Sequence, residues 1–211
     1  MAPPGPDIRD VSPKDLQKGE FKGAGSETFR VAVADGPDND IVKHGMEHRD
    51  VEVCGVFVGR LLQDEGGPFL EIEATIRGEH AASQGAQVTF THETWNHIHN
   101  EMDNRYPERK IVGWYHTHPG FGIFLSEFDL FIHQSFFNAP FQVAFVFDPR
   151  SGDEGFFCWK EGKTSRLAHF WVGRQMHCCR PAFEEVRHPP ASASDPRTGQ
   201  GQGEAARAAN D

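Results

Sequence analysis

The sequence has few cysteines and no long apolar run, and both scarcities exclude classes of protein. Four cysteines in 211 residues are too few for a disulfide-held scaffold, so we expect a reducing, cytoplasmic setting. No segment approaches the roughly 20 consecutive apolar residues of a membrane-spanning helix. The N-terminus is rich in proline and charge and lacks the apolar core of a secretory signal.

Basic residues are also scarce. The chain has 31 Asp and Glu against 21 Lys and Arg, which gives a formal net charge of −10. Nucleic-acid-binding proteins carry a basic surface, and anionic lipid attracts basic segments. We therefore expect no nucleic-acid partner and no association with a membrane surface.

The composition changes along the chain and predicts three parts. Residues 1–27 contain several prolines and a Gly-Ala-Gly-Ser run, which favours a flexible leader with one helical turn over 14–18. Residues 176–211 end in a low-complexity stretch without large apolar side chains, which is typical of a flexible tail. Residues 28–175 remain as one folded domain of ordinary size.

Within this domain the apolar periodicity alternates between strand and helix patterns. It predicts helices over 38–49, 91–104 and 126–137. It predicts strands over 29–33, 51–62, 69–77, 111–116, 141–148, 155–160 and 166–172, with hairpin turns at Gly66-Gly67 and Gly162. This order favours a mixed α/β (α+β) domain in which a single sheet is flanked by helices.

The segment from Trp114 to Asp129, WYHTHPGFGIFLSEFD, carries the chemistry. His116 and His118 are two residues apart at the end of a predicted strand, so both imidazoles point to the same side. Asp129 falls in the first turn of a helix that Ser126 opens, and this places a carboxylate on a rigid element. Two imidazoles and a carboxylate are a ligand set of catalytic zinc sites. Ser126 and Asp129 are also a helix-capping pair, and a lone His-x-His is more often a surface feature than a metal site.

Glu52 is the candidate for proton transfer. It begins the apolar run VEVCGVFVG, where a buried charge without a partner would be costly. Strand alternation places Glu52 on the same face as Cys54 and Val56. A solvated residue at a strand end and a functional carboxylate are both compatible with this position.

These residues together resemble a known family, the JAMM (MPN+, Mov34/PAD-1 type) zinc metalloproteases. The resemblance rests on Glu52, on His116-Thr117-His118-Pro119 and on Ser126-Glu127-Phe128-Asp129, and it extends over residues 41–159. The stretch IVGWYHTHPGFGIFLSEFD is especially similar to the proteasome-lid and signalosome isopeptidases. The chain lacks their long C-terminal helices and in this respect looks like the stand-alone prokaryotic, deubiquitinase-like members.

The resemblance implies the MPN (cytidine-deaminase-like) core and a role for each position. His116, His118 and Asp129 would hold one catalytic zinc ion. Glu52 would accept a proton from water and return it to the leaving amine, and Ser126 would hydrogen-bond the oxyanion. The implied activity is isopeptidase or peptidase cleavage at the C-terminus of a ubiquitin-like protein. The alternatives are a small-molecule amidohydrolase, a peptidase that processes sulfur carriers, and a non-catalytic scaffold.

Three further side chains lie close to these residues in the sequence. Phe121 and Phe124 bracket the histidine loop, and they are either core residues or a hydrophobic wall for an extended substrate tail. His133 follows Asp129 by one helical turn and could be read as a second metal ligand. We interpret it instead as a neighbour of the ligands or as a residue of the helix face, because the resemblance places no ligand there.

Overall fold

The computed structural model describes residues 12, 14, 16–23, 29–83 and 88–179. Ten strands form one sheet in the order β10-β9-β8-β7-β3-β4-β2-β11-β12, with β1 paired to β3. These strands are β1 (Gln17–Lys18), β2 (Arg30–Val33), β3 (Cys54–Asp64), β4 (Gly67–Arg77), β7 (Lys110–Thr117), β8 (Val143–Phe147), β9 (Glu154–Lys160), β10 (Lys163–Arg166), β11 (His169–Val172) and β12 (Gln175–Cys178). A separate pair consists of β5 (Ala82–Ser83) and β6 (Val88–Thr89).

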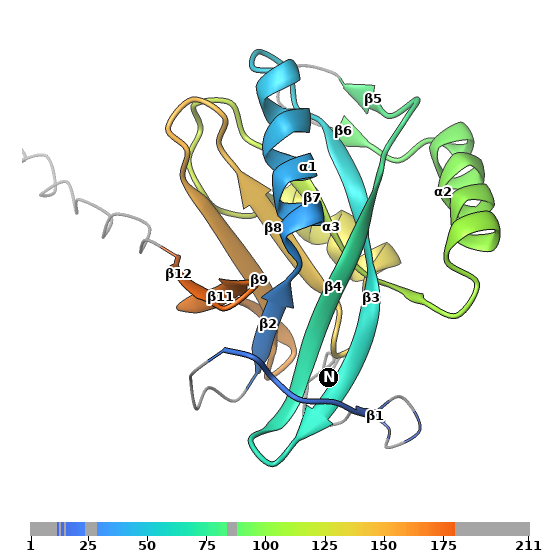
Figure 1. Cartoon of the computed structure of the whole chain (residues 1–211). Coiled ribbons are helices and arrows are strands. Elements are labelled where there is room, and N and C mark those ends of the chain that lie inside the picture. Colours follow the sequence, from blue (N-terminus) through green and yellow to red (C-terminus); the bar gives the residue numbers. More distant parts are fainter. Residues whose placement is uncertain (1–11, 13, 15, 24–28, 84–87, 180–211) are drawn as a thin grey trace, which may run out of the picture.

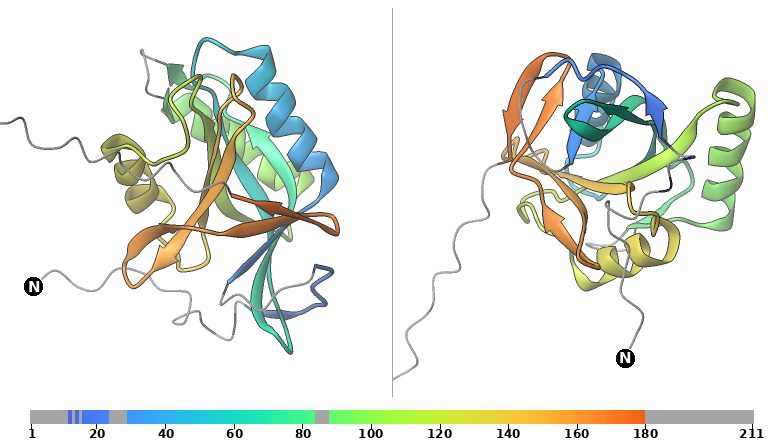
Figure 2. Two further views of the ribbon diagram at one scale, coloured as in Figure 1. Left: turned by 90° about the vertical axis from the view of Figure 1, so that its left-hand side faces the viewer. Right: turned by 90° about the horizontal axis from the view of Figure 1, so that it is seen from below.

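Three helices pack around this sheet: α1 (Asp35–Glu47), α2 (His92–Arg105) and α3 (Glu127–Phe136). The sheet is strongly curled, so that β4 lies in front of β7 and β8, and α1 packs between β4 and β8 (Figure 1). The views in Figure 2 place α1 and α3 on opposite sides of the sheet. The predicted mixed architecture, one main sheet flanked by helices, is confirmed.

Both faces of the central strands are buried, which explains their nearly continuous apolar sequences. In β3, Val56 and Val58 pack on the side of α2 and α3, whereas Phe57 packs on the side of α1. In β7, Trp114 packs on the side of α2 and α3, and its neighbour Tyr115 packs on the side of α1. The sheet therefore separates two apolar cores, and Trp114 of β7 lies in the same core as Ile132 of α3.

Helices α2 and α3 begin at matching sequence signals. Thr91 and Ser126 are the N-cap residues, and each forms a reciprocal capping box with the residue three positions later. Thr91 and Ser126 satisfy backbone N–H groups that a first helical turn leaves without partners. These two predicted helix starts are confirmed.

Three predictions of detail were wrong. Residues 17 and 18 form a parallel strand with β3 rather than a helical turn, and Phe21 is buried, so part of the predicted leader packs on the domain. The predicted strand over 166–172 is two strands, because β10 ends at Arg166 and β11 begins at His169. Residues 176–178 of the predicted tail belong to β12.

Among the described residues, no helix combines the length and the apolar character that a membrane crossing requires. All four cysteines are free thiols. Most of the predicted leader (1–11, 13, 15 and 24–27) and most of the predicted tail (180–211) lie outside the described part.

Candidate metal centre

Pairing of β3 with β7 brings Glu52 to the two histidines. The strands are antiparallel, and Cys54 lies opposite His116. One residue further on, the backbone N–H of Thr117 donates to the carbonyl of Val53, and the N–H of Val53 donates to Thr117 Oγ1, both at 3.0 Å. These bonds fix the chain immediately before β3. As a result Glu52 Oε1 lies 3.9 Å from His118 Nε2, and only 4% of Glu52 is exposed.

The structure brings His116, His118 and Asp129 together at one point. Their donor atoms all lie within 4.8 Å of one another. His116 Nε2 is 3.0 Å from His118 Nε2 and 3.3 Å from Asp129 Oδ1, and His118 Nε2 is 3.5 Å from Asp129 Oδ2. All three residues are buried. The histidines come from the end of β7 and the aspartate from the start of α3.

Ser126 orients the aspartate. Its hydroxyl and its backbone N–H both donate to Asp129 Oδ2, at 2.6 and 2.7 Å, while the N–H of Asp129 donates to Ser126 Oγ at 3.2 Å. The first turn of a helix also favours a negative charge. The capping role expected for this pair is therefore present, and it directs the Asp129 carboxylate towards the histidines.

The loop after β7 fixes the orientation of the His118 ring. His118 Nδ1 lies 3.1 Å from the carbonyl oxygen of Gly122, a residue with a φ of 82° that favours glycine. Asp148 Oδ1 holds the same loop by accepting from the N–H of Gly120 at 2.9 Å. Because a carbonyl only accepts, His118 carries a proton on Nδ1, so in the neutral ring Nε2 is the nitrogen available to a metal.

This donor set fits a zinc ion. Two imidazole nitrogens and one carboxylate match the ligands of hydrolytic zinc sites, and a carbonyl behind the second nitrogen is the usual support for a metal-binding histidine. The arrangement provides three protein ligands, as such sites use, and an acidic side chain lies next to them.

Burial and mutual contact set the charges of the cluster. Burial lowers the pKa of His116, which favours the neutral ring that metal binding requires. For His118 burial acts in the same direction, but the hydrogen bond and charge of Asp129 outweigh it and raise the pKa. Burial alone would raise the pKa of Asp129, yet its hydrogen bonds with the two histidines lower it. Asp129 is therefore an anion throughout the physiological range.

Glu52 has a different environment. Burial raises its pKa to about 7, only partly opposed by the charge of His118. A carboxyl group with a pKa close to neutrality can both accept and donate a proton at physiological pH. Its position and its pKa suit a proton-transfer group better than a solvated strand end.

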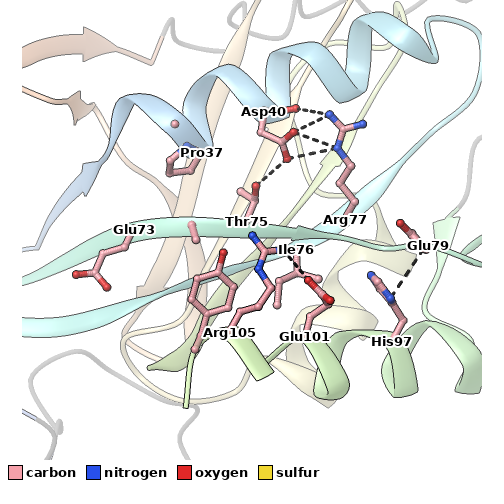
Figure 3. Close-up of a pocket in the computed structure, with 13 residues that line it drawn as sticks. Pro37, Asp40, Glu73, Thr75, Ile76, Arg77, Glu79, His97, Glu101 and Arg105 are labelled. Carbon is pink, nitrogen blue, oxygen red and sulfur yellow. Dashed lines mark hydrogen bonds and ion pairs between the residues drawn. The ribbon is translucent and has the colours of Figure 1, made fainter. Parts of the chain in front are cut away.

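Two hollows flank the central strands. One of about 430 Å³ is lined by Glu52 and by residues of α1 and the turn after β4, including His44, His48 and His80. The other, of about 520 Å³, lies over β4 between α1 and α2 (Figure 3). Its charged groups largely pair with each other, as in Arg77 with Asp40 and Arg105 with Glu101, both at 2.6 Å. No residue of the His-His-Asp cluster lines it.

Phe121 and Phe124 are both exposed, at 58% and 44%. The ring of Phe124 packs at 4.8 Å from the ring of His118. Neither residue is a core residue, so of the two interpretations offered by the sequence, the surface position beside the cluster is the one observed.

Trp114 lies beside the cluster and was not singled out in the sequence, and it connects His116 to His133. The Trp114 ring stacks on His116 at 4.5 Å, and its Nε1–H donates to His133 Nδ1 at 3.1 Å. His133 is completely buried, and burial together with the nearby His116 lowers its pKa to about 3. The i, i+2 spacing of Trp114 and His116 on one strand was a signal that could have revealed the stack.

The fold and cluster agree with a sequence family. A family model described as JAB1/Mov34/MPN/PAD-1 ubiquitin protease matches residues 38–139. Over these residues the chain matches the JAMM/MPN family. The match includes both histidines, Asp129, Ser126 and Glu52.

Curated relatives cover the same region. The chain is 34% identical over 119 residues to "NAD(+) hydrolase TcpA" of Theionarchaea archaeon, with 56% of this chain and 32% of that protein aligned. It is 31% identical over 117 residues to "26S proteasome regulatory subunit rpn11" of Schizosaccharomyces pombe, with 54% and 37% aligned. It is 28% identical over 113 residues to "COP9 signalosome complex subunit 5" of Caenorhabditis elegans, with 50% and 28% aligned. The aligned region thus spans about a third of these relatives.

A solved structure supports the fold. The solution structure of protein DSY2949 from Desulfitobacterium hafniense matches with a TM-score of 0.52 and 16% identity, over 69% of this chain and 94% of that one. At this identity the similarity concerns the fold alone.

Proposed function

We propose that this JAMM/MPN chain is a zinc-dependent isopeptidase or peptidase that hydrolyses the C-terminal linkage of a ubiquitin-like protein. The observation that carries the proposal is the convergence of His116, His118 and Asp129 with Glu52 beside them. The family description, which names a ubiquitin protease, supports the substrate class. The four free thiols suit a reducing, cytoplasmic setting.

In this proposal His116, His118 and Asp129 hold one zinc ion. When bound, zinc supplies Lewis acidity, which acidifies water and polarises a carbonyl group. Glu52 accepts the proton that water loses and later donates it to the leaving amine. The pKa of about 7 suits both steps, because neither protonation state of Glu52 is strongly disfavoured near neutrality.

Ser126 has one hydroxyl proton, and that proton is already donated to Asp129. To stabilise an oxyanion, the hydroxyl has to turn away from Asp129 when substrate binds. Its backbone N–H still holds Asp129 Oδ2, so the carboxylate keeps its orientation while the hydroxyl is redirected.

The two surfaces beside the cluster suit the two sides of the scissile bond. Phe121 and Phe124 form an exposed apolar wall next to His118, which suits the extended tail of a ubiquitin-like protein. The hollow of about 430 Å³ lined by Glu52 lies where the leaving amine has to be protonated.

A substrate panel tests this function. The full chain, loaded with zinc, is incubated with fusions of several ubiquitin-like proteins and with small amides. We expect cleavage at the end of the ubiquitin-like tail in at least one fusion. The Glu52→Gln variant should retain its metal and lose at least about a hundredfold in rate, the usual contribution of a general base. Full activity of this variant would remove Glu52 from the mechanism.

The panel also separates the alternatives. Turnover of small amides with no cleavage of any fusion would favour an amidohydrolase and contradict the ubiquitin-like substrate class. No turnover together with no bound zinc would favour a non-catalytic scaffold.

A further inference from the structure

The two histidines of the cluster are held in different ways. His118 has a backbone carbonyl behind its Nδ1. His116 Nδ1 is buried and has no hydrogen-bond partner among the described residues. Metal-binding histidines normally have such a partner, which fixes the plane of the ring. Another contact therefore has to set the orientation of His116.

The Trp114 ring provides that contact. It lies 4.5 Å from the His116 ring, with 12° between the two planes, so the rings are stacked face to face. The two side chains project from the same side of β7, two residues apart. Rotation of the His116 ring about its Cβ–Cγ bond would break this stack. The orientation of the indole therefore determines the direction of His116 Nε2.

His133 holds the indole. The Nε1–H of Trp114 donates to His133 Nδ1 at 3.1 Å, and both residues are completely buried. His133 is fixed in turn by stacking on Trp159 at 4.6 Å, with 15° between the planes, and Trp159 Nε1–H donates to the carbonyl of Phe137 at 3.0 Å. A hydrogen-bonded aromatic stack thus runs from the end of α3 to His116.

We propose that His133 is a positioning residue of the metal centre, which acts by holding Trp114 and, through it, the plane of His116. The inference rests on the proposed zinc site. His133 itself is not a ligand, and its bond to Trp114 takes the place of the missing partner of His116. His133 and Asp129 lie one turn apart on α3. The same helix therefore carries one proposed ligand, Asp129, and orients a second one, His116, through Trp114.

The test compares variants of the full chain. His133→Leu removes the acceptor, His133→Asn restores an acceptor near the position of Nδ1, and Trp114→Phe keeps a ring but removes the donor. Ile41→Ala is the matched control, since Ile41 is equally buried but belongs to the core on the other face of the sheet. Zinc affinity is measured by competition with a chelator, the ligand arrangement by the absorption spectrum of bound Co²⁺, and stability by thermal unfolding of the metal-free chains.

We expect His133→Leu and Trp114→Phe to weaken zinc binding by about 10- to 100-fold, as the loss of an outer-shell partner does, and to change the Co²⁺ spectrum. His133→Asn should recover most of the affinity, and Ile41→Ala should lose stability without losing affinity. Wild-type affinity in Trp114→Phe and in a folded His133→Leu would overturn the inference, as would an equal loss in Ile41→Ala. Absence of zinc binding in the wild type would overturn the proposed function as well, which distinguishes the two failures.

Discussion

Ser126 donates its hydroxyl proton to Asp129 Oδ2 at 2.6 Å, and Asp129 returns a backbone N–H to Ser126 Oγ at 3.2 Å. This reciprocal pair starts α3 and aims a carboxylate at His116 and His118. Thr91 and Thr94 form the same kind of box at the start of α2. The two boxes differ in that only the one at α3 includes a residue of the candidate metal centre.

Variants of Ser126 and Thr91 can therefore distinguish a capping role from a catalytic role. Ser126→Ala and Thr91→Ala should each lower the free energy of unfolding by about 1 kcal/mol, the usual contribution of an N-cap side chain. Ser126→Ala should also lower kcat by about a hundredfold or more, because an oxyanion donor is removed. Urea unfolding and steady-state kinetics on both variants measure the two effects. Equal and small changes in kcat would show that Ser126 is only a cap.

The buried His44 predicts a dependence of stability on pH. Its Nδ1 lies 2.8 Å from the hydroxyl of Tyr115, and burial, aided by the charge of Arg77, lowers its pKa to about 4. In the unfolded chain the pKa is about 6.5. Between these values the unfolded chain binds the proton and the folded chain does not, so stability falls as the pH drops from about 6.5 to about 4.

A His44→Leu variant removes this contribution. Unfolding free energies measured from pH 7 to pH 4 should fall less in the variant than in the wild type, by about 3 kcal/mol over the window. Parallel curves for the two proteins would contradict the assignment of His44 as a buried neutral group.

Gly59 marks a place where the sheet has no room for a side chain. The register between β3 and β4 shifts at Val58 and Gly59, and a Cβ on Gly59 would lie 1.9 Å from the carbonyl oxygen of Glu71. Since this neighbour is backbone, it cannot turn aside. Gly59→Ala should therefore destabilise the fold by about 3 kcal/mol, at the upper end of the range for overpacking.

Gly36 in the first turn of α1 is the matched control, because no atom lies within 4 Å of a Cβ placed there. Gly36→Ala should be neutral or stabilise the chain by up to about 1 kcal/mol, since alanine loses less entropy in a helix. Similar denaturation midpoints for both alanine variants would refute the steric explanation.

The main elements were predictable because periodicity and local signals agree with the fold. The apolar runs of β3, β7 and β8 and the caps Thr91 and Ser126 are such cases. The short strands β1, β5, β6 and β12 were missed, because two to four residues carry no detectable period. The pairing of β1 also depends on a partner distant in sequence, since Gln17 pairs with Leu62.

The site was predictable to a similar degree and for a similar reason. His116, His118 and Asp129 stand in one short segment, so their spacing already places them close together. Glu52 was ambiguous, since only the β3–β7 pairing brings it to His118. The support by Gly122 and Asp148 comes from backbone conformation and long-range packing, which no spacing in the sequence encodes. The spacing of His133 from Asp129 placed it near the ligands but did not reveal its bond to Trp114.

The zinc content of the purified full chain tests the central claim most directly. We predict about one zinc ion per chain in the wild type and in Glu52→Gln, and none in Asp129→Ala or His116→Ala, because each of the last two loses one of three ligands. Wild-type protein without stoichiometric zinc, or an undiminished zinc content in the two ligand variants, would contradict the account.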